Sequence, residues 1–153
     1  MNFLELKIPP PIVALSLGVL MWLTPPLAGT VDTPLGFRIA VALAFLVVGQ
    51  GIAISGMVEF RRAKTTINPV KASSASSLVT GGIYRYTRNP MYVGMLLTLV
   101  GWAAYLSNPL TLLFPLLFFL YMNRFQIRPE ERVLAALFGA PYVAYTGRVR
   151  RWI

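Results

Sequence analysis

Hydrophobic residues along this chain gather into four long runs, separated by polar connections. The runs cover Pro10–Ala28, Leu35–Val58, Met91–Leu106 and Pro109–Ile127. Each approaches the roughly 20 mostly apolar residues that a helix needs to cross a bilayer. The third run is the shortest and needs flanking residues or local thinning of the bilayer. The pattern predicts an all-α integral membrane protein with about four transmembrane helices in one membrane domain, residues 1–153.

A shorter amphipathic segment follows the last run. We expect Pro129 to break the fourth helix near Arg128, because proline disfavours a helical residue before it. Residues 130–138 then form a short helix with one apolar face, which suits the membrane interface. Gly139 can end this helix, and Pro141 begins a final turn or two. The apolar face consists of Val133, Leu134, Leu137 and Phe138.

Small residues recur at helical spacing in two of the predicted helices. Gly49, Ala53 and Gly56 share one face of the second, and Gly94 and Gly101 share a face of the third with Thr98. Such faces let helices approach closely. We expect helix packing at the first face, and either packing or passage of a ligand at the second.

Basic residues are distributed asymmetrically about these helices. Six of the 14 lysines and arginines lie in Arg61–Arg88 and six in Arg124–Arg151, whereas residues 29–36 contain none. The positive-inside rule therefore places both termini and the loop 61–80 in the cytoplasm. On this view residues 1–60 are two N-terminal helices and residues 81–153 the cofactor-binding half. The net charge of +9 reflects topology and attraction to anionic lipids, so nucleic acid is not an expected partner.

The composition also limits the chemistry. The chain has no cysteine and no histidine, which removes thiol nucleophiles, imidazole bases and the usual zinc and haem ligands. Its five acidic residues are spread along the sequence. We therefore expect no metal site.

Two polar clusters stand beside the predicted helices. The first is residues 81–94, with the sequence GGIYRYTRNPMYVG, and the second is residues 128–131, with the sequence RPEE. Only a hydrophobic hairpin separates them. We therefore expect the hairpin to return the second cluster to the first.

The first cluster surrounds a helix start. Asn89 is expected to cap free backbone N–H groups with its side chain, and Pro90 suits the first helical position. Arg85 and Arg88 add positive charge beside these N–H groups, which favours binding of a carboxylate or phosphate. Flat surfaces able to stack on a base come from Tyr84, Tyr86 and Tyr92.

The second cluster contributes two adjacent carboxylates, Glu130 and Glu131. Acids in a first helical turn complement the helix dipole, and they also accept hydrogen bonds from a ribose diol or an ammonium group. Together the clusters suggest a cytoplasmic-side pocket for a zwitterionic, base-containing molecule. S-adenosylmethionine fits this description, and so do some nucleotides.

The ordered combination of the 81–94 motif, a hydrophobic hairpin, Glu130-Glu131, Tyr142 and Tyr145 resembles the isoprenylcysteine carboxyl methyltransferase family. That family is related to membrane phospholipid methyltransferases. The resemblance covers residues 80–153. It implies an integral membrane methyltransferase that binds S-adenosylmethionine on the cytoplasmic side and admits a lipophilic or lipidated substrate from the bilayer.

The resemblance also implies roles for individual residues. Arg128 would orient a carboxylate acceptor, and Glu130 would take a proton from an amine acceptor. Members of the family carry a substrate-side arginine before the acidic pair. Gln126 occupies its position in one alignment, with Arg124 and Arg128 nearby. Many members have histidine where this chain has Asn89, which cannot act as a base near neutral pH. Cofactor binding would fall to Tyr86, Arg88, Asn89, Pro90, Tyr92, Gly94, Glu130, Glu131, Tyr142 and Tyr145.

The expected function is thus methyl transfer from S-adenosylmethionine to a lipophilic acceptor, of which an isoprenylcysteine carboxylate is the leading example. A phospholipid amine and a small lipophilic thiol are alternative acceptors. A non-catalytic membrane scaffold or small-molecule carrier is the alternative of another class. A carrier would more naturally show polar residues at mid-membrane, for which the candidates are Ser16, Gln50, Ser55 and Thr98.

Overall fold

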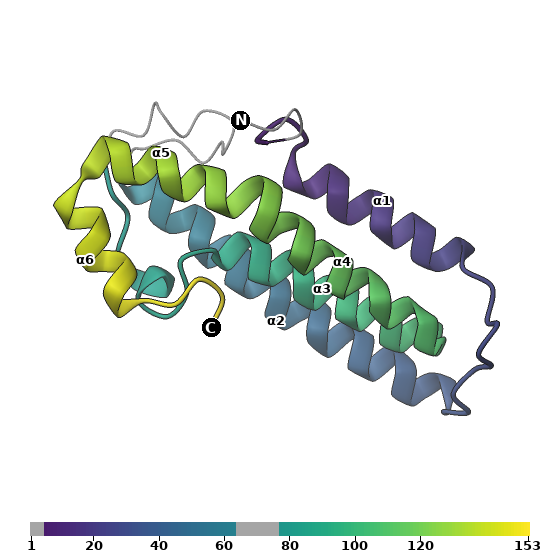
Figure 1. Cartoon of the computed structure of the whole chain (residues 1–153). Coiled ribbons are helices and arrows are strands. Elements are labelled where there is room, and N and C mark those ends of the chain that lie inside the picture. Colours follow the sequence, from purple (N-terminus) through teal and green to yellow (C-terminus); the bar gives the residue numbers. More distant parts are fainter. Residues whose placement is uncertain (1–4, 64–76) are drawn as a thin grey trace.

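A computed structural model describes residues 5–63 and 77–153 and is all-α, with no strand in these ranges. Figure 1 shows α2, α3 and the α4–α5 helix running side by side, with α1 along one flank and α6 across one end. Most of the predicted loop 61–80 lies outside the described residues. The α-helices are α1 (Pro10–Leu23), α2 (Leu35–Arg62), α3 (Pro90–Leu106), α4 (Leu113–Tyr121), α5 (Arg128–Phe138) and α6 (Ala140–Arg148). The 3₁₀ helices are η2 (Gly82–Arg85) and η3 (Pro109–Leu112), and η4 (Met122–Ile127) is a π-helical turn.

Two of these helices differ in length from the apolar runs that contain them. The run Pro10–Ala28 is helical only to Leu23, as the sequence Thr24-Pro25-Pro26 predicts, because the residue before a proline is extended and stops the helix. Helix α2 continues beyond Val58 to Arg62. Its last turn is charged, with an ion pair of 3.0 Å between Glu59 and Arg62.

Two described helical stretches are long and apolar enough to cross a membrane, by length and composition. They are Leu35–Arg62, with 28 residues, and Pro109–Phe138, with 30. Helices α1 and α3 are apolar but shorter, with 14 and 17 residues. Large apolar side chains project from the outer surfaces of the bundle, among them Leu15 and Val47, each 70% exposed. Such a surface suits lipid and is unfavourable in water.

Helices α2 and α3 are in close contact through their small residues, as predicted. A Cβ atom on Gly94 would lie 2.4 Å from the carbonyl oxygen of Gly49, and one on Gly101 would lie 2.7 Å from Cβ of Phe45. At the start of α3, a Cβ on Gly56 of α2 would meet the Pro90 ring at 2.8 Å. No side chain larger than hydrogen fits at these three points, so α2 and α3 pack closely along their length. The contact of Gly56 with Pro90 holds the first residue of α3 against α2.

The prediction that Pro129 breaks the fourth helix is wrong. The chain continues from α4 through the π-helical turn η4 directly into α5. In η4 the N–H of Arg128 bonds to the carbonyl of Asn123, five residues earlier. Proline lacks an N–H and its ring crowds the carbonyl four residues before it, so a regular α-helical turn is disfavoured here. The wider turn accommodates the proline without ending the helix.

The core lies between α1, α3 and α4. It contains Phe118 and Met122, both fully buried, together with Met21 and Leu99. Helix α1 is also tied to α3 by a hydrogen bond of 3.1 Å from the indole N–H of Trp102 to the carbonyl of Gly18. This core holds the start of α3 beside the start of α5, where both polar clusters lie.

Candidate functional site

The two polar clusters meet at one end of the helices, as the sequence predicted. The hydroxyl of Tyr92, in the first turn of α3, donates a hydrogen bond of 2.8 Å to Oε1 of Glu130, in the first turn of α5. One residue further along α5, Glu131 forms an ion pair of 3.1 Å with Arg88. The hydrophobic hairpin of α3 and α4 therefore brings residues about 40 positions apart into direct contact.

Glu130 is held by neutral donors from two helices. Besides Tyr92, the side-chain amide of Gln126 lies 3.4 Å from Oε1. Gln126 is 1% exposed and belongs to η4, so the π-helical turn supplies part of the carboxylate's surroundings. Among the described residues no hydrogen-bond partner reaches Oε2 of Glu130. That oxygen remains available as an acceptor.

Glu131 is paired with two arginines. Arg151 approaches both oxygens of the carboxylate, with Nε–Oε1 at 3.0 Å and Nη2–Oε2 at 2.6 Å. Donating these hydrogen bonds to Glu131 raises the pKa of Arg151 above its ordinary value. Such two-point contacts fix orientation as well as charge. In this structure Glu131 anchors the C-terminal residues to α5, in addition to pairing with Arg88.

The C-terminal residues 149–153 run across the start of α3. The carbonyl of Arg150 accepts a bond of 3.1 Å from the backbone N–H of Arg88. The carbonyl of Arg151 accepts one of 2.9 Å from the side-chain amide of Asn89. Asn89 occupies the N-cap position of α3, but its side chain makes no capping bond. The expectation that the Asn89 side chain caps α3 is therefore wrong, because the amide is turned toward the C-terminal segment.

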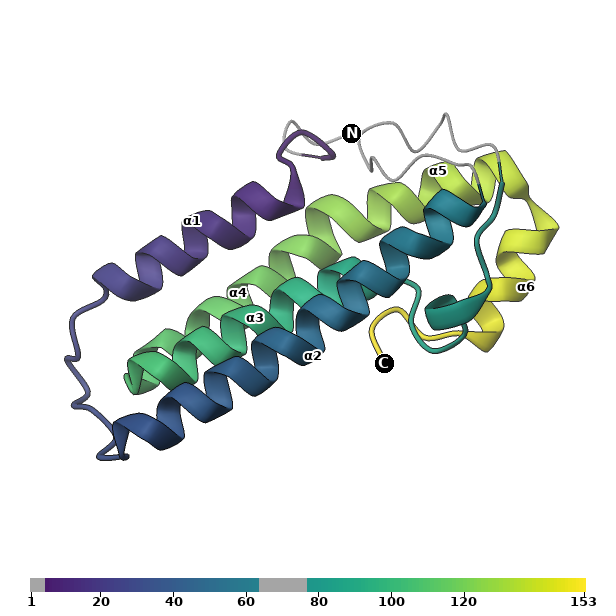
Figure 2. The ribbon, with the colours of Figure 1, turned by 180° about the vertical axis from the view of Figure 1, so that it is seen from behind.

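A small cavity of about 70 Å³ lies between α5, α6 and η2. Figure 2 shows η2 beside α6 at this end of the molecule. Typical ligand pockets hold roughly 300–1,000 Å³, so a ligand of nucleoside size requires the surrounding side chains to move. Six residues predicted from the sequence line the cavity: Arg88, Asn89, Glu130, Glu131, Tyr142 and Tyr145. The other lining residues are Phe60, Ser77, Leu78, Val79, Tyr84, Ile127, Leu134 and Phe138.

Two residues that line this cavity each have a buried polar atom without a hydrogen-bond partner within residues 5–63 and 77–153. The atoms are the hydroxyl oxygen of Tyr84, a residue 4% exposed, and Nε of Arg88. The Tyr145 hydroxyl, by contrast, donates a bond of 2.8 Å to the carbonyl of Tyr84. An unpaired buried donor costs about 1–3 kcal/mol. A hydrogen-bond acceptor that reached these atoms would remove that cost.

Burial keeps the tyrosines of the cavity neutral. It raises the pKa of Tyr142 to about 12, where the neighbouring Glu131 also contributes, and it raises the pKa of Tyr84 and of Tyr145 well above 10. Near neutral pH each phenol is a hydrogen-bond donor and carries no charge. The arginines of the site and Glu131, with which Arg88 and Arg151 pair, supply its ion pairs.

The remaining predicted residues lie outside the cavity lining. Tyr86 is 74% exposed on the surface, and Pro90 and Gly94 are buried against α2. Tyr92 contacts the site through its hydroxyl alone. Arg128 is exposed and lines a neighbouring open groove, together with Arg88, Glu131, Arg132, Ala135, Tyr142, Val143 and Thr146.

The cavity and the open groove share Arg88, Glu131 and Tyr142. These three side chains form a wall between an enclosed compartment and solvent-facing space. Tyr142 belongs to α6, which follows α5 across a one-residue joint at Gly139. Gly139 at this joint has φ of 56° and ψ of −131°, a conformation available essentially to glycine, and no atom lies within 4 Å of a Cβ there.

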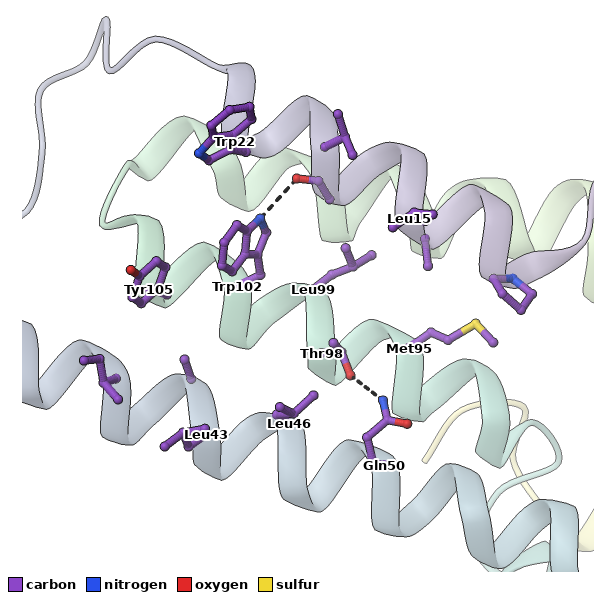
Figure 3. Close-up of a pocket in the computed structure, with 16 residues that line it drawn as sticks. Leu15, Trp22, Leu43, Leu46, Gln50, Met95, Thr98, Leu99, Trp102 and Tyr105 are labelled. Carbon is purple, nitrogen blue, oxygen red and sulfur yellow. Dashed lines mark hydrogen bonds between the residues drawn. The ribbon is translucent and has the colours of Figure 1, made fainter.

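A separate apolar groove of about 910 Å³ lies between α1, α2 and α3, toward the other end of the bundle. Figure 3 shows its walls, with Leu15 and Trp22 on α1, Leu43 and Leu46 on α2, and Trp102 on α3. The polar pair within it is Gln50 and Thr98, joined by a hydrogen bond of 3.1 Å. The groove begins at Met95, one turn of α3 from Tyr92.

Sequence reasoning missed two contributors to the site. The site predicted from the sequence includes neither Arg151 nor Asn123, yet Asn123 accepts bonds from Arg151 and from Trp152, at 3.5 and 3.2 Å. The sequence signal was the run Val149–Trp152, where two arginines and a tryptophan follow the last predicted helical turns. The partners of Arg151 and Trp152 lie 20 or more residues away, which local patterns do not reveal.

Comparison with known proteins identifies the family. Residues 37–141 match the family model described as phospholipid methyltransferase. A protein-S-isoprenylcysteine O-methyltransferase of Schizosaccharomyces pombe is 37% identical over 71% of this chain and 46% of its own length. A probable protein-S-isoprenylcysteine O-methyltransferase of Oryza sativa subsp. indica is 30% identical over 90% of this chain and 72% of its own length.

A third relative, an uncharacterized protein of Haemophilus influenzae, is 43% identical over 41% of this chain and its entire own length. The chain thus spans about half the length of the S. pombe relative and more of the other two. Together with the apolar helices, these matches show a membrane protein. The chain belongs to the phospholipid methyltransferase family and is related within it to the isoprenylcysteine O-methyltransferases.

Proposed function

We propose that this protein is a membrane methyltransferase that uses S-adenosylmethionine to methylate a lipophilic acceptor, of which the leading class is a carboxylate of isoprenylcysteine type. Family membership supports the reaction class. The observation that carries the site assignment is the cavity lined by Tyr84, Arg88 and Glu130, where the first two each keep a buried donor without a partner among the described residues. An anionic group would satisfy the donors, and an ammonium group or ribose diol would satisfy the carboxylate.

The topology proposed with this function has four membrane-crossing helices in one domain, residues 1–153. The two shorter helices, α1 and α3, pack between or beside the two long ones. The cavity lies at the end where Arg61, Arg88, Arg128 and Arg151 gather, which the positive-inside rule places in the cytoplasm. Helices α5 and α6 then lie at the membrane interface.

The residues divide the proposed task as follows. Arg88 and Tyr84 hold the anionic end of the cofactor, Glu130 accepts hydrogen bonds from its cationic or diol part, and Tyr142 and Tyr145 close the cavity. The bound cofactor supplies an activated methyl group. The protein's contribution is then to orient the acceptor and exclude water.

Arg128 is the proposed acceptor-side cation. It is exposed in the groove that adjoins the cavity across Arg88 and Glu131. A carboxylate acceptor is already nucleophilic and needs no base, so an arginine that orients it is sufficient. An amine acceptor must lose a proton, and Glu130 is then the base. The apolar groove of Figure 3 offers room for a lipophilic tail beside α3.

The test is calorimetric titration of S-adenosylhomocysteine into the purified protein in lipid nanodiscs. We expect saturable binding that Glu130→Gln and Arg88→Gln each weaken, whereas Arg148→Gln, an exposed arginine of α6, leaves it unchanged. Absence of binding to the parent protein in several lipids would support the scaffold or carrier alternative and reject the enzyme. Retained binding in both site variants would reject the site assignment alone.

The acceptor is identified by transfer of a labelled methyl group. The matched acceptors are an S-isoprenyl cysteine with a free carboxyl group, its methyl ester, a phosphatidylethanolamine and a lipophilic thiol. Labelling of the free acid but not the ester supports the carboxylate proposal. Labelling of the phospholipid amine instead, with loss of activity in Glu130→Gln, would replace it with the second candidate, which the family description favours.

A further inference from the structure

The π-helical turn η4 leaves one backbone carbonyl that the helix cannot satisfy in the usual way. In a regular α-helix the carbonyl of Phe125 would accept a bond from residue 129, but Pro129 has no N–H. The backbone N–H of Leu6 occupies this role, donating a bond of 3.0 Å to the carbonyl of Phe125. The segment before α1 thus supplies the hydrogen bond that Pro129 removes.

Glu5 fixes the same segment through charge. Its side chain is 4% exposed and pairs with Arg124 at 3.3 Å and with Arg132 at 2.7 Å. Arg124 lies within η4 and Arg132 lies two turns later in α5, so the carboxylate contacts the chain on both sides of Pro129. A buried carboxylate is tolerated only when it is paired in this way.

The backbone conformation of Leu6 is unusual and is maintained by contacts of this segment with η4 and α5. Leu6 has φ of 58°, in the left-handed region that a leucine rarely adopts. Such a conformation is costly and persists where surrounding contacts determine it. The contacts at Leu6 are the bond to Phe125 and the adjacent pairs of Glu5.

The π-helical turn η4 determines the direction in which the Glu130 side chain points. Each residue of an α-helix advances about 100° around the axis, so the extra residue of a π-helical turn changes the face on which every later residue lies. With η4 intact, Gln126 and Tyr92 both reach Oε1 of Glu130. Relaxation of η4 to α-helix would rotate Glu130 away from Tyr92.

We propose that Glu5 and the backbone of Leu6 form a positioning clip that holds η4 in its π-helical form and thereby aims Glu130 at the cofactor cavity. The clip rests on the proposed function, because the cavity is the site it serves. Glu5 is a positioning residue: it lies outside the cavity lining and acts through Arg124, Arg132 and η4.

A spectroscopic readout separates this clip from the proposed function. The chain has three tryptophans, and Trp152 donates a bond of 3.2 Å to Asn123 of η4. Trp22 and Trp102 lie in α1 and α3 and line the apolar groove. Fluorine NMR of protein labelled with 5-fluorotryptophan, with Trp152→Phe to assign the signal, therefore reports on η4 without any ligand.

The first variant is Glu5→Gln, with Asp32→Asn as the matched loss of one acidic charge in the exposed connection before α2. We expect Glu5→Gln to shift the Trp152 signal, to leave those of Trp22 and Trp102 in place, and to weaken S-adenosylhomocysteine binding about tenfold or more. Asp32→Asn should change neither. Glu5→Asp, which keeps the charge, should restore part of the affinity.

The second variant, Pro129→Ala, tests η4 independently in case Glu5→Gln does not fold. Alanine returns the N–H to the helix and has the highest helix propensity, so we expect unchanged or higher stability, a shifted Trp152 signal and weaker ligand binding. An unmoved Trp152 signal in Glu5→Gln would overturn the clip whatever Pro129→Ala shows, and so would a moved signal with parental affinity. If the parent protein binds no S-adenosylhomocysteine, the proposed function fails and the Trp152 signal alone decides whether the clip holds η4.

Discussion

Glu131 is predicted to matter more for stability than either of its arginine partners alone. It accepts from Arg88 at 3.1 Å and from Arg151 at 3.0 and 2.6 Å. Arg151→Gln leaves the carboxylate paired with Arg88. Glu131→Gln leaves Arg88 without its ion pair, although the Arg88 side chain is only 14% exposed and its Nε already has no partner among the described residues.

The exposure of the three side chains sets the expected cost. Breaking a buried pair by removing one partner costs about 3–5 kcal/mol, whereas an exposed pair contributes about 0–1 kcal/mol. The Glu131 and Arg151 side chains are 20% and 32% exposed, between these cases. We expect about 2–3 kcal/mol for Glu131→Gln and about 1 kcal/mol for Arg151→Gln. The double variant should cost no more than Glu131→Gln, a coupling of about 1 kcal/mol.

The assay is reversible unfolding in mixed micelles with a rising fraction of sodium dodecyl sulfate, followed by circular dichroism. Arg148→Gln is the matched control, because Arg148 is exposed in the same region and forms no ion pair within residues 5–63 and 77–153. It should change the free energy of unfolding by less than about 0.5 kcal/mol. Equal costs for Glu131→Gln and Arg151→Gln, or additive costs, would refute the dependence of Arg88 on Glu131.

Three further predictions concern the contacts around this centre. Tyr92→Phe removes the hydroxyl that donates to Glu130 at 2.8 Å. It should weaken S-adenosylhomocysteine binding about tenfold in calorimetry, with a smaller change in the free energy of unfolding. An affinity equal to that of the parent protein would contradict this prediction. Gly94→Ala places a methyl group 2.4 Å from the Gly49 carbonyl and should destabilise the protein by at least about 1–3 kcal/mol in the micelle assay; an unchanged midpoint would show that α2 and α3 separate easily. The pKa of Tyr142, raised to about 12, predicts full stability below pH 10 and a loss as pH rises from 10 through 12, which Tyr142→Phe should reduce; identical alkaline profiles would contradict it.

The meeting of the two polar clusters was predictable because it follows from coarse properties of the chain. Two apolar runs of similar length, joined at Ser107 and Asn108, return the chain to the end where it began. The basic residues on both sides of that hairpin assign its ends to one side of the membrane. The bond between Tyr92 and Glu130 confirms the predicted contact.

The course of the chain at Pro129 was not predictable from local rules. Those rules state that proline removes a donor and crowds a carbonyl, which predicts a break. They do not include the donor that Leu6 provides from more than 100 residues away. The same limit applies to Asn89, which is a good cap by residue type and instead bonds to the carbonyl of Arg151. In both cases a tertiary hydrogen bond replaces the local one.

The adjacent carboxylates also show why a motif alone does not assign roles. Glu130 and Glu131 are neighbours in sequence, but about 100° of rotation separates them on the helix. Glu130 therefore faces Tyr92 and Gln126, which are neutral and leave one of its oxygens without a partner among the described residues. Glu131 faces Arg88 and Arg151, which neutralise it. Since a ligand's ammonium or hydroxyl groups need an acceptor that is not already paired, Glu130 is the member of the pair suited to binding, and Glu131 is suited to holding Arg88 and the C-terminal segment in place.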